Sequence, residues 1–404
     1  MLSALYGCVK FHSKPSVPRY GRFGMQILVN ATSVRLGGGI TVLRNLLPAL
    51  TEADGGRHRY VVIAHEDSAD IIDPRRSRVV VETARAGKSL VSRMSWEQLR
   101  LPLRSLIDRA DVVFSPGGIA VLGCPKPQVL MFQNMAPFEA RVVARAPTPK
   151  RHRLLLLRHL GALSGRLAQR VVFISDYARN AIAPLIGGGS QRSRVIHLGR
   201  DEAFQPSAAT GAGADATAAR FALPARYLLS VSQFYFHKNF LELIDAFATA
   251  IPDLPDDVAL VIAGGEHEPA YARAVRERIE VRGLGARVRL LGEVPYSDLP
   301  TLYARCLAVI FPSVVESFPN VLVEGLASGA PTFASALGPM KEIAGDAAEY
   351  FDPYDRAAIS RAISRACSET ELRDGMRARG IARASQFTWN KTAHELLGVM
   401  EAAA

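Results

Sequence analysis

The sequence lacks the features that mark several protein classes. Its four cysteines, Cys8, Cys124, Cys306 and Cys367, have no CxxC spacing, so neither a zinc site nor a disulfide framework is indicated and a reducing compartment fits best. No apolar run approaches the roughly 18 residues that span a bilayer, which argues against an integral membrane protein. A length of 404 residues, of which 49% are hydrophobic, is typical of a folded chain with about two or three domains.

The net charge of +11 is concentrated in two short segments. Residues 1–24 carry four basic residues and no acidic one, and residues 141–170 carry eight basic residues and no acidic one. The charge of these two segments together slightly exceeds the net charge of the whole chain, so the rest of the chain is close to neutral. The basic character is therefore a local patch rather than a field around the whole protein. We expect residues 1–24 to be a disordered leader.

Two series of short apolar runs, separated by helix-length segments, indicate parallel sheets built from βαβ units. The first series is QILVNATS, RYVVIAH, DVVFSP, QVLMFQN, RVVFIS and SRVIHLG, and the second is RYLLSVSQ, VALVIAGG, VRLLGEV, LAVIFPS and APTFAS. The predicted fold class is α/β, with Rossmann-like doubly wound domains at residues 25–204 and 221–385. Residues 205–220, rich in Ala, Gly, Ser and Thr, are expected to form a linker or surface loop. We expect a C-terminal helix within residues 386–404 that packs back toward the first domain.

Two glutamates eight residues apart, Glu316 and Glu324, follow the apolar run LAVIF in the stretch ESFPNVLVE. Pro319 suits the first turn of a helix, which would make the backbone N–H groups of about residues 318–321 the unpaired donors of a helix N-terminus and a binding site for phosphate. Glu324 then lies about one and a half turns into the helix, where its carboxylate can accept hydrogen bonds from neighbouring hydroxyls such as those of a ribose. Taken alone, either glutamate is better explained as an ordinary solvated side chain.

Two further segments add groups at the expected strand ends. Lys238, in SVSQFYFHKNF, stands between a strand and a helix, so its ammonium can act there as a point charge for a phosphate. Gly37, Gly38 and Gly39 follow the first strand and let a ligand approach the backbone closely. This run is not a dinucleotide fingerprint, because Val42 stands where the GxGxxG pattern needs glycine.

Taken together, these segments resemble the retaining glycosyltransferases of family 4, which have the GT-B fold. The resemblance covers most of residues 25–390, and its most specific part is the E-x7-E pattern from Glu316 to Glu324. The matching blocks are GGG, VSQFYFHKN, VIAGG, LLGEVPYSDLPTLYARC, ESFPNVLVEGLASGAP, FASALGPMKEI and GDAAEYFDP. The resemblance implies two Rossmann-like domains facing across a cleft and a hexosyltransferase activity in polysaccharide or O-antigen-type biosynthesis. It also implies a nucleotide-sugar donor held mainly by the C-terminal domain and an acceptor held mainly by the N-terminal one.

The resemblance assigns roles on the donor side. Glu324 would bind the nucleotide ribose, and the candidate catalytic residues are Glu316, at the donor sugar, and Lys238, which would neutralise the diphosphate leaving group. The other candidate donor-binding residues are Ser317, Phe318, Pro319, Asn320 and Val321 beside the helix start, Gln233 near the place where family members often have Arg, and Gly38 and Gly39 from the first domain. The family is thought to attack on the face from which the leaving group departs, so Glu316 is not assigned as a nucleophile.

We expect no cofactor and no metal requirement. Lys238 and the helix N-terminus can carry the charge of the leaving diphosphate, and no acidic DxD-like motif stands at a strand end. On the acceptor side, the candidates are Asn134 and Glu139 in MFQNMAPFE, where many family members have His. Because a neutral amide cannot act as a general base, Glu139 or the leaving phosphate itself would accept the proton of the acceptor.

Residues 141–170 allow two interpretations. Leu156, Leu160, Leu163 and Leu167 fall at helical spacing, with arginines on other faces. One interpretation is a core-facing helix with a solvated basic side. The other is contact with an anionic membrane surface, worth about 1 kcal/mol for each basic residue near it. We therefore expect a cytoplasmic protein, with peripheral attachment at the inner membrane face as one alternative.

Several functional questions stay open at the level of sequence. The donor is either GDP-mannose-like or a UDP- or dTDP-sugar. Another GT-B enzyme, such as a nucleotide-sugar epimerase, is an alternative function. A nucleic-acid-binding protein is disfavoured, because the arginines are not interleaved with aromatic residues and match no nucleic-acid-binding module.

Overall fold

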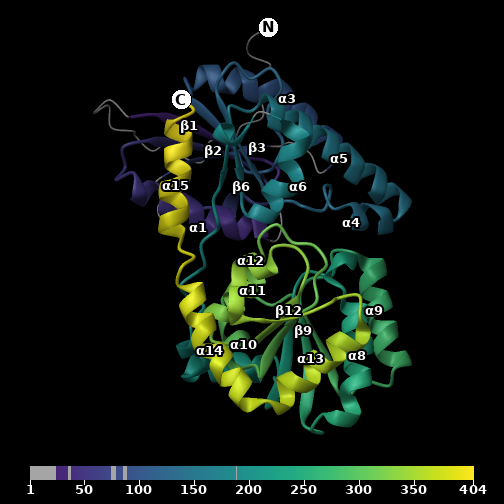
Figure 1. Ribbon diagram of the computed structural model, residues 1–404. Helices are drawn as coiled ribbons and strands as arrows, with labels where there is room; N and C mark the ends of the chain where they lie inside the picture. The colour runs from purple at the N-terminus through teal and green to yellow at the C-terminus, as the bar shows by residue number, and fades with distance from the viewer. Residues whose placement is uncertain (1–23, 35–37, 74–78, 85–88, 188) are drawn as a thin grey trace. The chain divides into compact units, whose positions relative to one another are not determined.

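The computed structural model describes residues 24–34, 38–73, 79–84, 89–187 and 189–404 (Figure 1). Residues 1–23 of the expected leader lie outside these described residues. The chain divides into two compact units, the first formed by Met1–Gly199 with Trp389–Ala404 and the second by Arg200–Thr388.

The first unit is built on a seven-stranded parallel sheet with the strand order β3-β2-β1-β4-β5-β6-β7. Its strands are β1 Gln26–Ala31, β2 Arg59–His65, β3 Val80–Ala84, β4 Val112–Ser115, β5 Gln128–Phe132, β6 Arg170–Phe173 and β7 Ser193–Val195. Its helices are α1 Gly38–Ala53, α3 Leu90–Ile107, α4 Ala140–Arg145, α5 Thr148–Leu167, α6 Asp176–Ile186 and α15 Trp389–Glu401, with short 3-10 turns at Ala69–Ile71 and Ser190–Arg192. Figure 1 shows α3, α5 and α6 on one side of this sheet and α1 with α15 on the other.

The second unit has a six-stranded parallel sheet with the order β10-β9-β8-β11-β12-β13. Its strands are β8 Arg226–Val231, β9 Val258–Ala263, β10 Val288–Gly292, β11 Ala308–Phe311, β12 Thr332–Ser335 and β13 Glu349–Phe351. Its helices are α7 Ala212–Arg220, α8 Phe240–Ala250, α9 Pro269–Val281, α10 Leu299–Arg305, α11 Asn320–Ala327, α12 Met340–Ala344, α13 Arg356–Ser368 and α14 Thr370–Ala384, with 3-10 turns η4 Pro206–Ala209, η5 Phe236–Lys238, η6 Ile251–Asp253 and η7 Gly345–Ala347.

Both sheets confirm the predicted α/β class with parallel strands and interleaved helices. The apolar runs become strands buried on both faces, as in VALVIA of β9, whose six residues are all buried. In each unit, the strand order reverses next to the first strand, between β1 and β4 and between β8 and β11. Ligands of doubly wound sheets bind beside the carboxyl ends of the strands at such a reversal. These two places are therefore where functional side chains are expected.

The segment 205–220, expected as a linker or surface loop, is instead partly helical. It contains η4 and α7, both of which contact α10 within the second unit. The hydroxyl of Thr217 on α7 donates to Asp298 at 3.0 Å. Alanine is the strongest helix former, so the composition that indicated a loop also suits a short helix once α10 covers one of its faces.

The core-facing interpretation of the leucines on α5 is wrong. Leu156, Leu163 and Leu167 are 48%, 42% and 53% exposed. The buried residues of α5 are Leu154, Gly161, Ser164 and Gly165 instead. A Cβ added to Gly161 would lie 3.0 Å from the ring of Phe138, so there is no room for a larger side chain at that position. None of the helices in the described ranges combines the length and apolar character needed to span a bilayer.

Candidate functional site

The predicted catalytic residues Lys238 and Glu316 form an ion pair at the strand reversal of the second unit. Lys238 ends η5 in the loop after β8, and Glu316 lies in the loop after β11, so two residues 78 positions apart in sequence meet. The Lys238 Nζ and Glu316 Oε1 atoms are 2.6 Å apart, and each side chain is 14% exposed. The two loops are also joined by the N–H of Val314, which donates to the carbonyl of His237 at 2.9 Å. The pair is therefore held by neighbouring parallel strands.

Glu324 lies on α11, and its carboxylate is buried. Burial raises the pKa of Glu324 to about 7, and the negative charge of Asp201 acts in the same direction. Hydrogen bonds from the hydroxyls of Tyr303 and Tyr296 lower this pKa, because they favour the charged carboxylate. A carboxylate that titrates near neutral pH inside a protein is typical of a functional site.

Two tyrosine hydroxyls hold the Glu324 carboxylate, and the sequence argument missed both. Tyr303 on α10 donates to Oε2 at 3.3 Å, and Tyr296 in the loop before α10 donates to Oε1 at 3.4 Å. The ring of Phe204 packs edge-on against both tyrosine rings, at centroid distances of 5.5 Å from Tyr296 and 5.7 Å from Tyr303. Both tyrosines stand in the segment PYSDLPTLY, but Tyr296 precedes α10, so helical spacing does not connect the two rings and no local pattern places them beside Glu324.

The start of α11 differs in part from the prediction. Pro319 directly precedes the helix rather than occupying its first turn, and its carbonyl accepts hydrogen bonds from the N–H groups of Leu322 and Val323. Pro319 has no N–H to offer, and the N–H of Asn320 already donates to the carbonyl of Phe318 at 3.0 Å. These two backbone groups are therefore not the unpaired donors that the sequence suggested. The donor-binding roles predicted for residues 317–321 stay predictions.

Gln233 joins the loops that follow β8 and β9. Its side-chain oxygen accepts a hydrogen bond from the N–H of Gly265 at 2.7 Å. The preceding Gly264 is required by packing, since an added Cβ would lie 1.8 Å from the carbonyl oxygen of Ser232. The glycines of VIAGG thus let the two loops approach closely, and Gln233 links them. Its contact with a donor stays a prediction.

An aromatic stack in the same loops was also missed. The ring of Tyr235 is nearly parallel to the rings of His237 and His267, with centroid distances of 5.4 and 5.8 Å. The N–H of Phe236 donates to the carboxylate of Glu268 at 3.0 Å. These contacts fix the loop that carries Lys238, and those to His267 and Glu268 join residues about 30 positions apart that no local pattern connects.

The glycine loop of the first unit is described only in part. Gly38 is the first residue of α1, and a Cβ added to Gly39 would lie 3.1 Å from the side chain of Val34. Gly37 lies outside the described residues. Nearby, a Cβ added to Gly117 would lie 1.9 Å from the hydroxyl of Ser33, so the loops after β1 and β4 pack closely at this strand reversal. The approach of Gly38 and Gly39 to a donor stays a prediction.

The acceptor-side candidates Asn134 and Glu139 both lie in the loop after β5. The side-chain oxygen of Asn134 accepts a hydrogen bond from the N–H of Ala136 at 3.0 Å, which fixes the turn. Glu139 directly precedes α4, and its Oε2 accepts a hydrogen bond from the hydroxyl of Tyr177 at 2.5 Å. Because this bond orients the Glu139 carboxylate while leaving its other oxygen as an acceptor, the residue has the chemistry of a general base.

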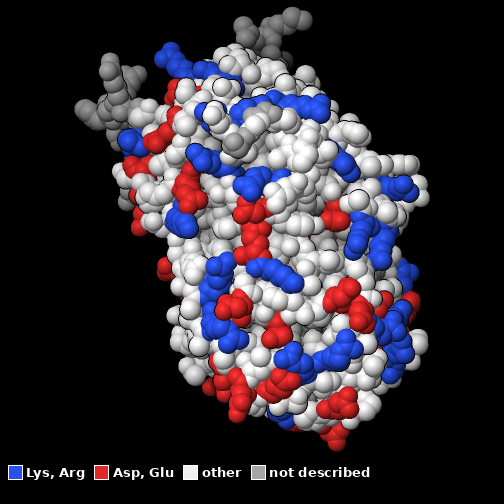
Figure 2. All heavy atoms as spheres, in the orientation of Figure 1, with Lys and Arg blue, Asp and Glu red and all other residues white. Residues whose placement is uncertain are grey.

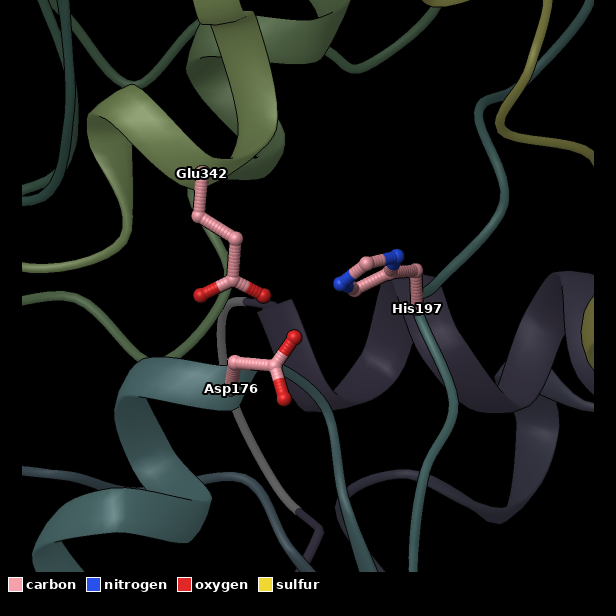
Figure 3. A group of neighbouring side chains, drawn as sticks. All are labelled: Asp176, His197 and Glu342. Atoms are coloured by element: carbon pink, nitrogen blue, oxygen red, sulfur yellow. The ribbon is translucent and has the colours of Figure 1, made fainter.

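Figure 3 shows three side chains of a type that metal ions favour, Asp176, His197 and Glu342. Asp176 begins α6 and His197 follows β7, both in the first unit, whereas Glu342 belongs to α12 of the second unit. Because they come from different units, no metal site is assigned to them. The carbonyl of His197 accepts a hydrogen bond from the hydroxyl of Thr392 at 2.8 Å, which ties the segment after β7 to α15.

Two family models match the two halves of the chain. The model described as Glycosyltransferase Family 4 matches residues 36–204, and the model described as Glycosyl transferases group 1 matches residues 217–383.

Curated relatives match shorter stretches. The chain is 38% identical over 102 residues to the O-antigen chain mannosyltransferase B of Escherichia coli, a match that covers 25% of this chain and 27% of the relative. It is 34% identical over 153 residues to a D-inositol 3-phosphate glycosyltransferase of Salinispora tropica, covering 37% of this chain and 32% of the relative. The matches thus span about a third or less of the length of these relatives.

Solved structures match over nearly the whole chain. The sucrose-phosphate synthase of Thermosynechococcus elongatus aligns with a TM-score of 0.76 and 18% identity, covering 94% of this chain and 98% of that one. The HepE protein of Anabaena, solved in complex with UDP-glucose, aligns with a TM-score of 0.74 and 21% identity, covering 93% and 99%. At these identities, the likeness establishes the fold.

Proposed function

Since the chain belongs to glycosyltransferase family 4 and has the GT-B fold, we propose that this glycosyltransferase is a retaining hexosyltransferase that uses a nucleotide-sugar donor. The proposed acceptor is a glycan or a lipid-linked glycan, in polysaccharide or O-antigen-type biosynthesis. The similarity to an O-antigen chain mannosyltransferase supports this acceptor class, and the UDP-glucose bound by HepE supports a nucleotide-sugar. The family models match glycosyltransferases, so the epimerase and nucleic-acid-binding alternatives are not retained.

The observation that carries the proposal is the grouping of three charged residues in the second unit. Lys238 and Glu316 are paired at the ends of neighbouring strands, and Glu324 is buried on the helix that follows. In the proposed site, Lys238 binds the diphosphate, Glu316 accepts hydrogen bonds from the hydroxyls of the sugar, and Glu324 accepts them from the ribose. An ammonium fixed where negative charge develops lowers the barrier to departure of the diphosphate.

The ion pair gives both catalytic residues a partner before the donor binds. A partly buried charge without a partner is destabilising, so the ion pair keeps Lys238 and Glu316 in place. When the donor enters, the phosphate oxygens become a second partner for the Lys238 ammonium, and the sugar hydroxyls become donors to the Glu316 carboxylate. We assign neither residue as a nucleophile.

We also propose that the reaction needs no metal ion. In this proposal, Lys238 and the N-terminus of α11 stabilise the negative charge of the leaving diphosphate in place of a metal cation. Donor hydrolysis should then proceed at the same rate in a chelator as in magnesium or manganese. A rate restored only by the metal would overturn this proposal.

On the acceptor side, we propose that Glu139 or the leaving phosphate receives the proton of the acceptor hydroxyl. The hydrogen bond from Tyr177 supports Glu139, because it fixes the carboxylate in one orientation. Asn134, whose side-chain oxygen already accepts a backbone hydrogen bond, is proposed to contact the acceptor through its amide NH2 group.

The donor is tested with the full-length protein and a panel of GDP-mannose, UDP-sugars and dTDP-rhamnose. We expect thermal stabilisation and slow donor hydrolysis with one nucleotide class. Glu324→Gln should remove the stabilisation, and Glu280→Gln, at an exposed position of α9, is the matched control. If no donor stabilises the protein and Glu324→Gln changes nothing, the proposed function is wrong.

We further propose contact between residues 141–170 and an anionic membrane surface. The exposed leucines of α5 support it, because apolar side chains flanked by arginines suit a lipid interface. A second exposed apolar stripe lies on α3, on the same side of the sheet, where Leu99 and Leu103 are 77% and 56% exposed. Figure 2 shows basic side chains over this side of the first unit with few acidic ones among them, whereas the second unit mixes both signs.

Flotation with lipid vesicles tests the membrane proposal. We expect binding to vesicles that contain phosphatidylglycerol, loss of binding at high salt, and none to pure phosphatidylcholine vesicles. The double variant Leu156→Ser, Leu163→Ser should bind less, whereas Val281→Ser, at an exposed position of the second unit, should bind as the wild type does. Absence of salt-sensitive binding would count against the proposal.

A further inference from the structure

The sheet of the first unit ends at β7, whose neighbour in the sheet is β6. The N–H of Ile196 donates to the carbonyl of Phe173 on β6 at 2.8 Å. Because the hydrogen-bonding groups of successive residues in a strand point to opposite sides, the backbone groups of Ser193 and Val195 point away from β6. No strand in the described part of the chain pairs with this side of β7. The edge can therefore accept a further strand.

A groove lies beside this edge on each face of the sheet. The helices α6 and α15 contact β6 from opposite faces (Figure 1). The groove beside α6 has a volume of about 720 Å³ and the groove beside α15 has one of about 460 Å³, and Arg194 and Val195 line both. A Cβ added to Gly187 at the end of α6, or to Gly398 on α15, would meet no atom within 4 Å. Both grooves thus have room for the side chains of an added strand, which alternate between the two faces.

The groove beside α6 is basic. Three arginines line it, Arg179, Arg192 and Arg194, and none of the described residues that line it is acidic. Arg179 pairs with Asp176 at 2.7 Å, so the two other arginines leave a net positive charge. Carboxylate side chains on one face of an added strand would complement this groove.

The groove beside α15 is more apolar and carries charges of both signs. Its apolar side chains are those of Val195, Ile196, Val399 and Ala402, and its charged residues are Arg170, Arg194 and Glu395. Apolar side chains on the second face of an added strand would pack here. The two grooves together therefore fit a strand in which acidic and apolar residues alternate.

Charge disfavours a second copy of this chain as the added strand. Two copies paired edge to edge about a two-fold axis would set β7 antiparallel to itself and bring their Arg194 side chains close together. Like charges at such positions are destabilising, whereas acidic side chains would pair with the arginines.

We propose that the outer edge of β7 binds a partner protein through an extended segment in which acidic and apolar residues alternate. This segment adds to the seven-stranded sheet as a further strand. Its main chain pairs with Ser193 and Val195, its carboxylates face the groove beside α6, and its apolar side chains face the groove beside α15. The surface contains none of the residues proposed to bind the donor or the acceptor.

The experiment uses the full-length protein and a pool of synthetic peptides of about ten residues, in which glutamate alternates with valine, isoleucine or tyrosine. One matched pool has lysine in place of glutamate. A second keeps the acidic sequences but carries N-methyl groups on alternate backbone nitrogens, which remove main-chain donors without changing the charge. Fluorescence anisotropy measures the affinity, and amide hydrogen exchange locates the bound peptide.

We expect the acidic peptides to bind at least about 10-fold more tightly than the lysine peptides or the N-methylated peptides. Binding should slow amide exchange at Val195, whose N–H faces the added strand. The effect should be smaller at Arg194, whose N–H faces β6.

Two variants separate main-chain pairing from charge. Val195→Pro removes an outward N–H and leaves the pairing with β6, since proline is tolerated at the solvent side of an edge strand. Arg194→Glu reverses a charge shared by both grooves. Each should weaken binding of the acidic peptides about 10-fold, and Arg194→Glu should strengthen binding of the lysine peptides. Arg273→Glu, at an exposed position of α9, is the matched control, and the Tm of each variant checks its folding.

Failure of the acidic peptides to bind, or equal binding of the lysine peptides, overturns the proposal. Binding that neither Val195→Pro nor N-methylation weakens places the peptide elsewhere and also overturns it. A dimer in analytical ultracentrifugation that Val195→Pro dissociates would show that the edge binds a second copy of the chain instead of an acidic partner.

Discussion

The two units share a strand order but differ in what stands at their strand ends. In the second unit, the loops after β8 and β11 bring Lys238 and Glu316 within 2.6 Å of each other. In the first unit, the loops after β1 and β4 are closely packed around small residues such as Gly117. The unit places its carboxylate, Glu139, one strand further along, after β5. The same architecture thus carries a charged pair at the strand reversal of one unit and closely packed small residues at the strand reversal of the other.

The largest effect should come from the charged pair. Replacing Lys238 with alanine removes the proposed cation at the leaving diphosphate, so we expect kcat to fall by about 10²- to 10³-fold. The measurement is single-turnover transfer or donor hydrolysis, with Lys341→Ala on α12 as a control for loss of an exposed lysine. An unchanged kcat in Lys238→Ala would show that Lys238 takes no part in the catalytic step.

A smaller effect is expected at the carboxylate of the first unit. Glu139→Gln keeps the shape of the side chain and the contact with Tyr177 but loses the base, so we expect transfer to fall by about 10²-fold. Nucleotide affinity should stay unchanged, because the role proposed for Glu139 is on the acceptor side. A normal transfer rate in Glu139→Gln would indicate that the leaving phosphate, and not Glu139, accepts the proton of the acceptor hydroxyl.

The smallest effect concerns stability. The pKa of Glu324 is about 7 in the folded protein and near 4.5 when exposed, so the folded state binds more protons between these values. The contribution of Glu324 to stability is therefore fully present below about pH 4.5 and is lost as the pH rises through 7. We therefore expect the Tm of Glu324→Gln to rise relative to that of the wild type as the pH increases from 5 to 8. Each kcal/mol of difference in the free energy of unfolding should shift the Tm by about 2–4 °C. A Tm difference that is constant with pH would contradict the assigned titration.

Local sequence patterns were sufficient to predict the strands and to recognise the motif from Glu316 to Glu324. Continuous apolar runs predict buried parallel strands, and VALVIA is buried along its whole length. The pairing of Lys238 with Glu316 could not be predicted from residue spacing, because it depends on which strands are neighbours. The tyrosines that hold Glu324 depend in the same way on where α10 lies against α11.

The error on α5 has a specific physical cause. Periodicity showed that the leucines share one face but not which face is buried. The packing is decided by Gly161 and Gly165, since a Cβ added to Gly165 would lie 2.5 Å from the side chain of Ile186. A helix that packs this closely on its neighbours turns its smallest residues inward. Leu154 is buried on the same face, whereas Leu156, Leu163 and Leu167 face outward.

The ion pair between Lys238 and Glu316 also couples substitutions at the two positions during evolution. Losing either residue alone leaves the other as a partly buried charge without its partner, which destabilises the fold as well as the site. Losing both at once leaves two neutral side chains and a smaller penalty, so the effects of the two substitutions do not add. Homologues that have lost the catalytic activity should therefore have both residues replaced more often than one residue alone.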